Sequence, residues 1–308
     1  MTAREIERDG FAAVALLAGE LEATFVPGAG MVGASLRHRG DELLGQRAGL
    51  RAYAERGSTM GIPLLHPWAN RLSGDIYTAG GRRVDLGAAP RVRRDPGGLP
   101  IHGLLAGVPH WRVTGLDADG AAANCTAALD VGAHVDLTAG FPFPHALSVH
   151  VALDAAALRV TTTVRATGDV AVPIAFGWHP YLVLPGVPRA RWRVTLPARR
   201  HLLTDARGLP TGATEPLGAE EEPLGVRTLD DGYDALATAA FTLAGGGRSL
   251  TVTFDAGYPC AQAYAPGDQD VVCFEPMTAP TNALVSGDGL RSVAPGATFS
   301  AAFAISVR

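Results

Sequence analysis

Lysine is absent from this chain of 308 residues, and all 26 of its basic residues are arginine. A lysine amine is the usual nucleophile of Schiff-base enzymes, and it is also the phosphate ligand of a P-loop. The sequence therefore excludes both of these lysine-dependent chemistries.

Cysteine and long apolar segments are also scarce. The three cysteines, Cys125, Cys260 and Cys273, are too few for a disulfide framework, and none stands in a C-x-x-C pair typical of zinc sites. No apolar run approaches the ~20 residues of a membrane helix. The N-terminus lacks the basic region of a signal peptide. We expect a protein of the reducing cytoplasm that has no membrane partner.

Charge and short motifs exclude further classes. The net charge is −4 and the arginines are scattered, so no nucleic-acid partner is expected. The nine histidines show neither H-x-H nor H-E-x-x-H spacing, so no metal site is predicted. Residues 28–33, "GAGMVG", match G-x-G-x-x-G, but no helical pattern follows them. We interpret this stretch as a turn between strands.

Glycine and proline are abundant, with 38 and 22 residues, and they separate short segments of alternating polarity. Such punctuation is typical of many short strands. Alternation predicts hairpins over 147–164 and 241–254 and a strand over 299–307, whereas 49–57 suits a short helix. Residues 206–228 are expected to form a long loop. The predicted fold is all-β, a large antiparallel β-sandwich in one domain over residues 1–308.

Two stretches carry polar side chains that an apolar core would not select. In "GIPLLHPWANRLSGDIY", Asn70 and Arg71 follow Trp68. This combination of donors beside an indole suits a hydroxyl-rich ligand, and the alternative is an Arg71 that bridges carboxylates between loops. In "TLDDGYDAL", Asp230 leads a group of acidic residues of which at least one is explained by turn chemistry.

Two histidines and a glutamate are candidates for proton transfer. His102 lies in "LPIHGLL", where alone it would more often be a core histidine, whereas His179 lies between Trp178 and Pro180 in "GWHPY". Proline keeps the residue before it extended, and an imidazole exchanges protons near neutral pH. Glu275 ends the apolar run of "VVCFEP". A buried carboxylate of this kind is either an ion-pair partner or a general base.

In their order along the chain, these stretches resemble the aldose 1-epimerase, or mutarotase, family with its galactose-mutarotase-like β-supersandwich fold. The resemblance spans nearly the whole chain. It rests on P-x-x-x-P-W-x-N-R at 63–71, His-Gly at 102–103, W-H-P-Y at 178–181, D-x-x-Y at 230–233, and Glu-Pro with a downstream N-A-L at 275–284.

The resemblance implies a role for each candidate. Glu275 would be the general base and His179 the general acid that open and close the ring of a sugar, with no metal or organic cofactor. The sugar would be bound by the remaining candidates: Arg71, His102, Asp230 and Asn70 as polar partners, and Trp68, Trp178, Tyr181 and Tyr233 as stacking surfaces that are equally explained as core aromatics.

Two alternatives stay open at this point. One is a non-catalytic sugar-binding protein on the same fold, and the other is glycoside hydrolysis by Asp230 and Glu275. His66 and Pro180 depart from the family pattern as we know it. They leave open whether the sugar is neutral, sulfonated or phosphorylated, whether His66 lines the pocket, and whether His102 or His179 donates the proton.

Overall fold

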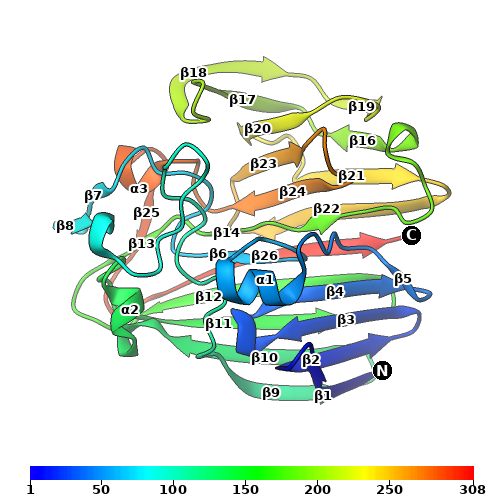
Figure 1. Cartoon of the computed structure of the whole chain (residues 1–308), viewed down its shortest axis with the longest axis horizontal. Helices are drawn as coiled ribbons and strands as arrows, with labels where there is room; N and C mark the ends of the chain where they lie inside the picture. The colour runs from blue at the N-terminus through cyan, green and yellow to red at the C-terminus, as the bar shows by residue number, and fades with distance from the viewer.

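The computed structural model describes residues 1–308, and antiparallel sheets dominate it (Figure 1). The largest sheet has nine strands in the order β19-β16-β21-β22-β26-β12-β11-β10-β9. Their bounds are β9 (Arg112–Ala118), β10 (Ala123–Asp130), β11 (His145–Leu153), β12 (Ala157–Ala166), β16 (Arg193–Leu196), β19 (Glu220–Pro223), β21 (Ala240–Gly245), β22 (Arg248–Ala256) and β26 (Thr298–Val307).

Two further sheets complete the architecture. A five-stranded sheet contains β1 (Thr2–Arg8), β2 (Phe11–Ala18), β3 (Leu21–Val26), β4 (Val32–His38) and β5 (Asp41–Glu42). An eight-stranded sheet contains β6 (Leu64–Leu65), β14 (Gly177–Trp178), β15 (Tyr181–Leu182), β17 (Arg199–Thr204), β18 (Pro210–Leu217), β20 (Leu229–Asp234), β23 (Cys260–Ala265) and β24 (Val272–Met277).

The remaining elements are short. Two strand pairs are β7 (Ile76–Ala79) with β8 (Arg82–Asp85), and β13 (Val172–Ile174) with β25 (Arg291–Val293). The helices are α1 (Gly49–Arg56), α2 (Val135–Thr138) and α3 (Ala283–Ser286), with 3-10 turns η1 (Pro27–Ala29), η2 (Leu86–Ala88), η3 (Val131–Ala133) and η4 (Arg189–Arg191). No helix has the length and apolar character needed to cross a membrane.

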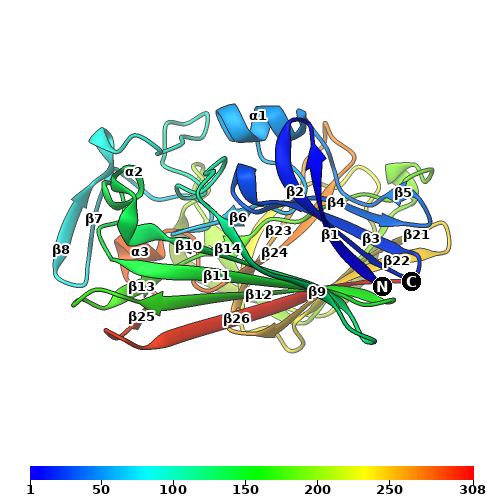
Figure 2. The same ribbon diagram turned by 90° about the horizontal axis from the view of Figure 1, so that it is seen from below.

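The sheets pack in two layers, with the nine-stranded sheet as one of them. Figure 2 shows the five-stranded sheet lying against the part of this layer that β9, β10 and β11 form. The eight-stranded sheet covers the other part, since Phe274 of β24 meets Phe241 of β21 with ring centroids 5.6 Å apart. A cluster of 70 buried residues fills the space between the layers. Burial of this apolar surface is the main driving force for the fold.

Most of the predicted elements are confirmed. Alternation gave the correct pairings β11 with β12 and β21 with β22, and helix α1 lies where it was expected. Of residues 28–33, the first four lie in the turn between β3 and β4, which includes η1, and the last two begin β4. The long loop predicted over 206–228 is wrong, because β18 and β19 occupy most of it. Glu275 was placed at the end of the apolar run, but strand β24 continues beyond it, through Pro276 to Met277.

Candidate functional site

Strand β24 presents Glu275 on the face of the eight-stranded sheet that points away from the core. Side chains alternate along a strand, so Phe274 enters the core and Glu275 takes the opposite face. Across the sheet, Glu275 pairs in register with Gln262 of β23, and Gln262 pairs with Gly232 of β20. This outer face is where the predicted polar residues gather.

Glu275 is almost completely buried, with 1% of its surface exposed. Its neighbours two residues away on the same face, Cys273 and Met277, belong to separate small apolar clusters. Burial raises the pKa of Glu275 well above its ordinary value; the charge of Asp230 adds to the rise and Arg71 opposes it. Atom Oε2 of Glu275 has no hydrogen-bond partner, so the carboxyl group is left able to bind a ligand.

His179 lies directly beside this carboxyl group. Its Nε2 is 3.2 Å from Oε1 of Glu275 and 3.3 Å from the hydroxyl of Tyr181, whose ring stacks on the imidazole at 4.3 Å between centroids. The connection between β14 and β15 holds the residue there, since its backbone N–H donates to the carbonyl of Pro63. Burial lowers the pKa of His179 well below its ordinary value, and His102 and Arg47 add to this.

These opposite shifts have one cause. Burial disfavours the charged form of each group, so it raises the pKa of Glu275 and lowers that of His179. Groups this close titrate together, and the apparent pKa values belong to the pair. The two groups form a coupled pair that is almost completely buried.

Two loops bring Asn70, Arg71 and His102 to the same face. The backbone N–H of His102 donates to the carbonyl of Asn70 over 3.0 Å, and Arg71 forms a bridge with Ile101. Gly103 is required at this crossing, since a Cβ there would lie 2.2 Å from the carbonyl oxygen of His66. Burial, with the positive charges of Arg71, Arg47 and Arg93, lowers the pKa of His102 to about 3. His102 is therefore a neutral donor and acceptor.

Arg71 is held by a carboxylate that the sequence analysis did not identify. Its Nε donates to Oδ2 of Asp95 over 2.7 Å, and Nη1 donates to Oδ1 of Asn70 over 3.2 Å. Burial works to raise the pKa of Asp95, but hydrogen bonds from Arg71 and from the Leu99 N–H outweigh it and hold the pKa low. The ion pair joins two loops, as the alternative of a bridging Arg71 predicted. "RRDPGG" offered only a turn signal for Asp95.

Asp230 is exposed and lies at the edge of the candidate site. Its Oδ1 accepts a hydrogen bond of 2.8 Å from Nε2 of Gln262. Gln262 was not predicted from the sequence. It stands between Ala261 and Ala263, and this alternation of polar and apolar residues marks one face of the strand as polar. Because Gln262 also pairs with Glu275, it connects the carboxylate of Asp230 to the middle of the site.

The aromatic candidates need correction. Trp68 is 1% exposed and lies in the main core, so its prediction as a stacking surface is wrong. Trp178 is also in the core, where its Nε1 donates to Thr162. Tyr181 is buried behind His179, and it positions this imidazole rather than offering an open face. Large aromatic side chains bury a large apolar area and contribute strongly to the energetics of the core, which explains why these residues lie there.

Tyr233 and His66 likewise lie outside the candidate site. Tyr233 is buried beneath the guanidinium of Arg199, which lies 4.6 Å from its ring centre. His66 is buried in contact with His145, with 2.8 Å between their Nε2 atoms, and Phe141 packs against it. His66 therefore belongs to the interior and does not line the site.

A cavity of about 380 Å³ opens beside His102. Arg47 lines it and also donates to the hydroxyl of Tyr181 over 3.0 Å, so one wall of the cavity is joined to the residue that stacks on His179. The other charged residues of its lining are Arg56, Arg93 and Arg94, and no acidic residue is among them. The cavity lining is therefore rich in positive charge, although Arg94 among these residues is paired with Asp75.

A family model for aldose 1-epimerase matches residues 24–306. The chain belongs to the aldose 1-epimerase family. Among curated proteins, "Uncharacterized protein YihR" of Escherichia coli K12 is 28% identical over 157 residues, which are 49% of this chain and 47% of YihR. The matched region thus spans about half the length of that relative.

Solved structures of similar fold support the architecture of this family member. A galactose mutarotase-like protein from Clostridium acetobutylicum superposes with a TM-score of 0.84 at 17% identity, covering 99% of this chain and 98% of that one. Slr1438 from Synechocystis gives 0.79 at 22% identity, covering 98% of each chain. Galactose 1-epimerase from Lactobacillus acidophilus gives 0.76 at 15%, covering 99% and 98%. The galactose mutarotase-like fold is confirmed.

Proposed function

We propose that this protein is an aldose 1-epimerase that interconverts the α and β anomers of a sugar, with Glu275 as general base and His179 as general acid. The observation that carries the proposal is the buried contact of 3.2 Å between these groups, beside the unpartnered Oε2 of Glu275 and Nδ1 of His102. Leaving buried polar atoms unpaired costs about 1–3 kcal/mol each. A polar ligand that pairs them regains this free energy.

The short separation suits the chemistry of a hemiacetal. Glu275 takes the proton from the hydroxyl oxygen O1, the bond between C1 and the ring oxygen O5 breaks, and His179 gives a proton to O5. O1 and O5 are bonded to the same carbon, so the base and the acid must reach neighbouring atoms. Rotation about C1–C2 then presents the other face of the aldehyde, and closure with the roles reversed gives the opposite anomer.

The remaining side chains have binding roles in this proposal. Arg71 and Asn70 donate to sugar hydroxyls, neutral His102 donates or accepts, and Asp230 accepts. We add Gln262, because its amide lies between Asp230 and Glu275 in the sheet. Tyr181 orients His179 through the ring stack.

Exchange between anomers is the direct test. Freshly dissolved α-D-glucose, α-D-galactose and charged aldoses are followed by polarimetry or by NMR with and without the protein. Catalysed equilibration supports the proposal. A sugar that binds without any faster exchange would favour the non-catalytic sugar-binding protein.

Hydrolysis of glycosides by Asp230 and Glu275 is less well supported. The backbones of the two residues stand two strands apart and are offset by two positions in register. Asp230 is exposed, and its carboxylate is already hydrogen-bonded to Gln262. Release of an aryl leaving group from aryl glycosides would revive this alternative.

Asp95 offers a test of how Arg71 is held. We expect Asp95→Asn to raise KM about 10-fold with a smaller change in kcat, because the amide loses the charge that orients the guanidinium. Asp234→Asn is the matched control, since it weakens the ion pair with Arg200 on the same sheet. Unchanged KM in Asp95→Asn, or equal changes in both variants, would contradict a substrate-binding role for Arg71.

The arginine-lined cavity favours an aldose that carries an anionic substituent. Arg47 donates to the side chain of Gln269 and to oxygens of Thr59 and Tyr181, Arg93 donates to the carbonyl of Ala106, and neither forms an ion pair. Two guanidinium groups without carboxylate partners are suited to phosphate, sulfonate or carboxylate oxygens. We therefore place an anionic aldose first among the substrates to be tried.

This substrate class makes a separate prediction. Arg93→Gln should raise KM for glucose 6-phosphate or a 6-sulfonated glucose about 10- to 100-fold, since a charge-assisted hydrogen bond contributes about 1.5–3 kcal/mol. KM for glucose should change little. Arg4→Gln, on exposed strand β1, is the control. Equal effects of Arg93→Gln on neutral and anionic sugars would contradict the anionic substituent while leaving the epimerase proposal intact.

A further inference from the structure

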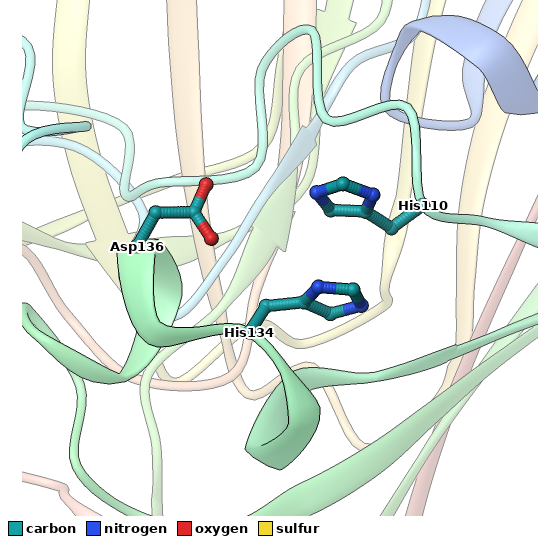
Figure 3. Close-up of side chains that lie close together, drawn as sticks. All are labelled: His110, His134 and Asp136. Atoms are coloured by element: carbon teal, nitrogen blue, oxygen red, sulfur yellow. The ribbon is translucent and has the colours of Figure 1, made fainter.

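A second group of side chains lies where the loop before β9 meets the turn between η3 and α2. Figure 3 shows His110, His134 and Asp136 together, and one ligand atom from each lies within 4.8 Å of the others. We propose that these three residues bind a divalent transition-metal ion, for which Zn²⁺ is the best match. The proposal rests on no part of the epimerase activity.

The donor set is the first argument. Imidazole nitrogens and carboxylate oxygens are the ligands of zinc, at about 2.0–2.2 Å from the ion. Two histidines with one carboxylate make a set of three protein ligands, which leaves a fourth position for water. Both histidines are half-buried, yet no ring nitrogen of either one is hydrogen-bonded to the protein. Their donor capacity is therefore free for an ion.

The carboxylate is already fixed by a neighbour. Nε of Arg91 donates to Oδ2 of Asp136, while Oδ1 has no arginine partner. Ligating carboxylates are commonly oriented in this way by a hydrogen bond from outside the ligand set. Asp136 can thus offer one oxygen to a metal and keep its bond to Arg91.

The histidine rings must turn for both to bind. They stack face to face, with centroids 3.9 Å apart and 4° between their planes. A metal lies in the plane of each ring that binds it, so two parallel rings cannot share one ion. A cavity of about 520 Å³ lined by both histidines gives room for one ring to leave the stack. Ligand atoms around a tetrahedral zinc lie about 3.4 Å apart at these bond lengths. They lie within 4.8 Å of one another here, so they must approach one another as one ring turns out of the stack.

Calorimetric titration of the metal-free protein with ZnCl₂ tests the site. We expect one equivalent to bind, affinity to fall at least about 100-fold in the double variant His110→Gln with His134→Gln, and about 10-fold or more in Asp136→Asn. The matched control is His201→Gln. His201 lies 3.0 Å from Glu215 and 3.2 Å from Asp231, so it is a competing group of one histidine and two carboxylates, and its loss should leave zinc affinity unchanged.

Two further measurements keep the result decisive. Bound Co²⁺ should show the visible absorption of a tetrahedral site in the wild type and not in the double variant. Zinc should raise the midpoint of thermal unfolding of the wild type and of His201→Gln only. If the double variant fails to fold, Asp136→Asn decides alone. Zinc binding that is equally tight in wild type and in Asp136→Asn, or that is lost in His201→Gln, would overturn the proposal.

Discussion

Replacing Glu275 by glutamine is expected to reduce anomer exchange by about 10²–10⁴-fold, the range that a positioned acid–base group contributes. The amide has the size of the carboxyl group but cannot take the proton from O1. Asp230, the other carboxylate of the site, has its backbone two strands away and is hydrogen-bonded to Gln262, so we do not expect it to replace Glu275. We expect kcat to carry most of the loss, since the sugar hydroxyls keep their partners Arg71 and His102.

The same substitution should make the folded protein more stable at neutral pH. The folded-state pKa of Glu275 is raised above its ordinary value of 4.5, so its contribution to stability is fully present below that value. That contribution is lost as pH rises from 4.5 through the folded pKa, because a buried carboxylate must then ionise. Glutamine has no such cost. The gain in unfolding free energy of Glu275→Gln over wild type should therefore grow as pH rises through this window.

Denaturant unfolding at several pH values, with anomer exchange measured on the same samples, checks both parts. Glu42→Gln is a suitable control, because this half-buried glutamate hydrogen-bonds to Ser35 and to backbone N–H groups and has no hydrogen bond or ion pair with His179. A Glu275→Gln protein that is destabilised at neutral pH and retains its turnover per folded molecule would identify Glu275 as a structural partner of His179.

Much of the architecture was predictable because one face of most strands is buried. Alternation of apolar residues identified β11, β12, β21, β22 and β26. Strand β18 was missed for the complementary reason: it is exposed along almost its whole length, so no apolar period of two marks it. Hydrophobic patterning reports burial, and it is silent where a strand is held by hydrogen bonds alone.

The site was predictable in its members but not in its geometry. Glu275 and His179 stood out because a carboxylate in an apolar strand and a histidine before proline are unusual. Their contact depends on β15 pairing with β24, a long-range pairing that no local pattern encodes. Asp95 and Gln262 were missed since a turn aspartate and a single glutamine are common on surfaces. Trp68 shows the opposite error, because its proximity in sequence to Arg71 suggested a shared site.

Replacing His179 by glutamine should lower kcat by about 10²–10³-fold and also change the shape of the pH profile. The amide nitrogen of glutamine can keep the hydrogen bond to Oε1 of Glu275, so the loss reports the missing acid and not a missing contact. In the wild type, the productive pair carries one proton in all. Activity should fall at low pH, when both groups are protonated, and at high pH, when neither is, which gives a bell-shaped profile.

In His179→Gln only Glu275 titrates, and water must supply the proton for O5. Its residual activity should rise with pH through the raised pKa of Glu275 and then stay level, so the alkaline limb disappears. The control is His150→Gln, which removes a half-buried histidine bonded to Thr126 on the nine-stranded sheet. This variant should retain the bell-shaped pH profile. If His179→Gln is slower but retains both limbs, the imidazole only positions Glu275, and the proton for the ring oxygen must come from another neighbour such as His102 or Tyr181.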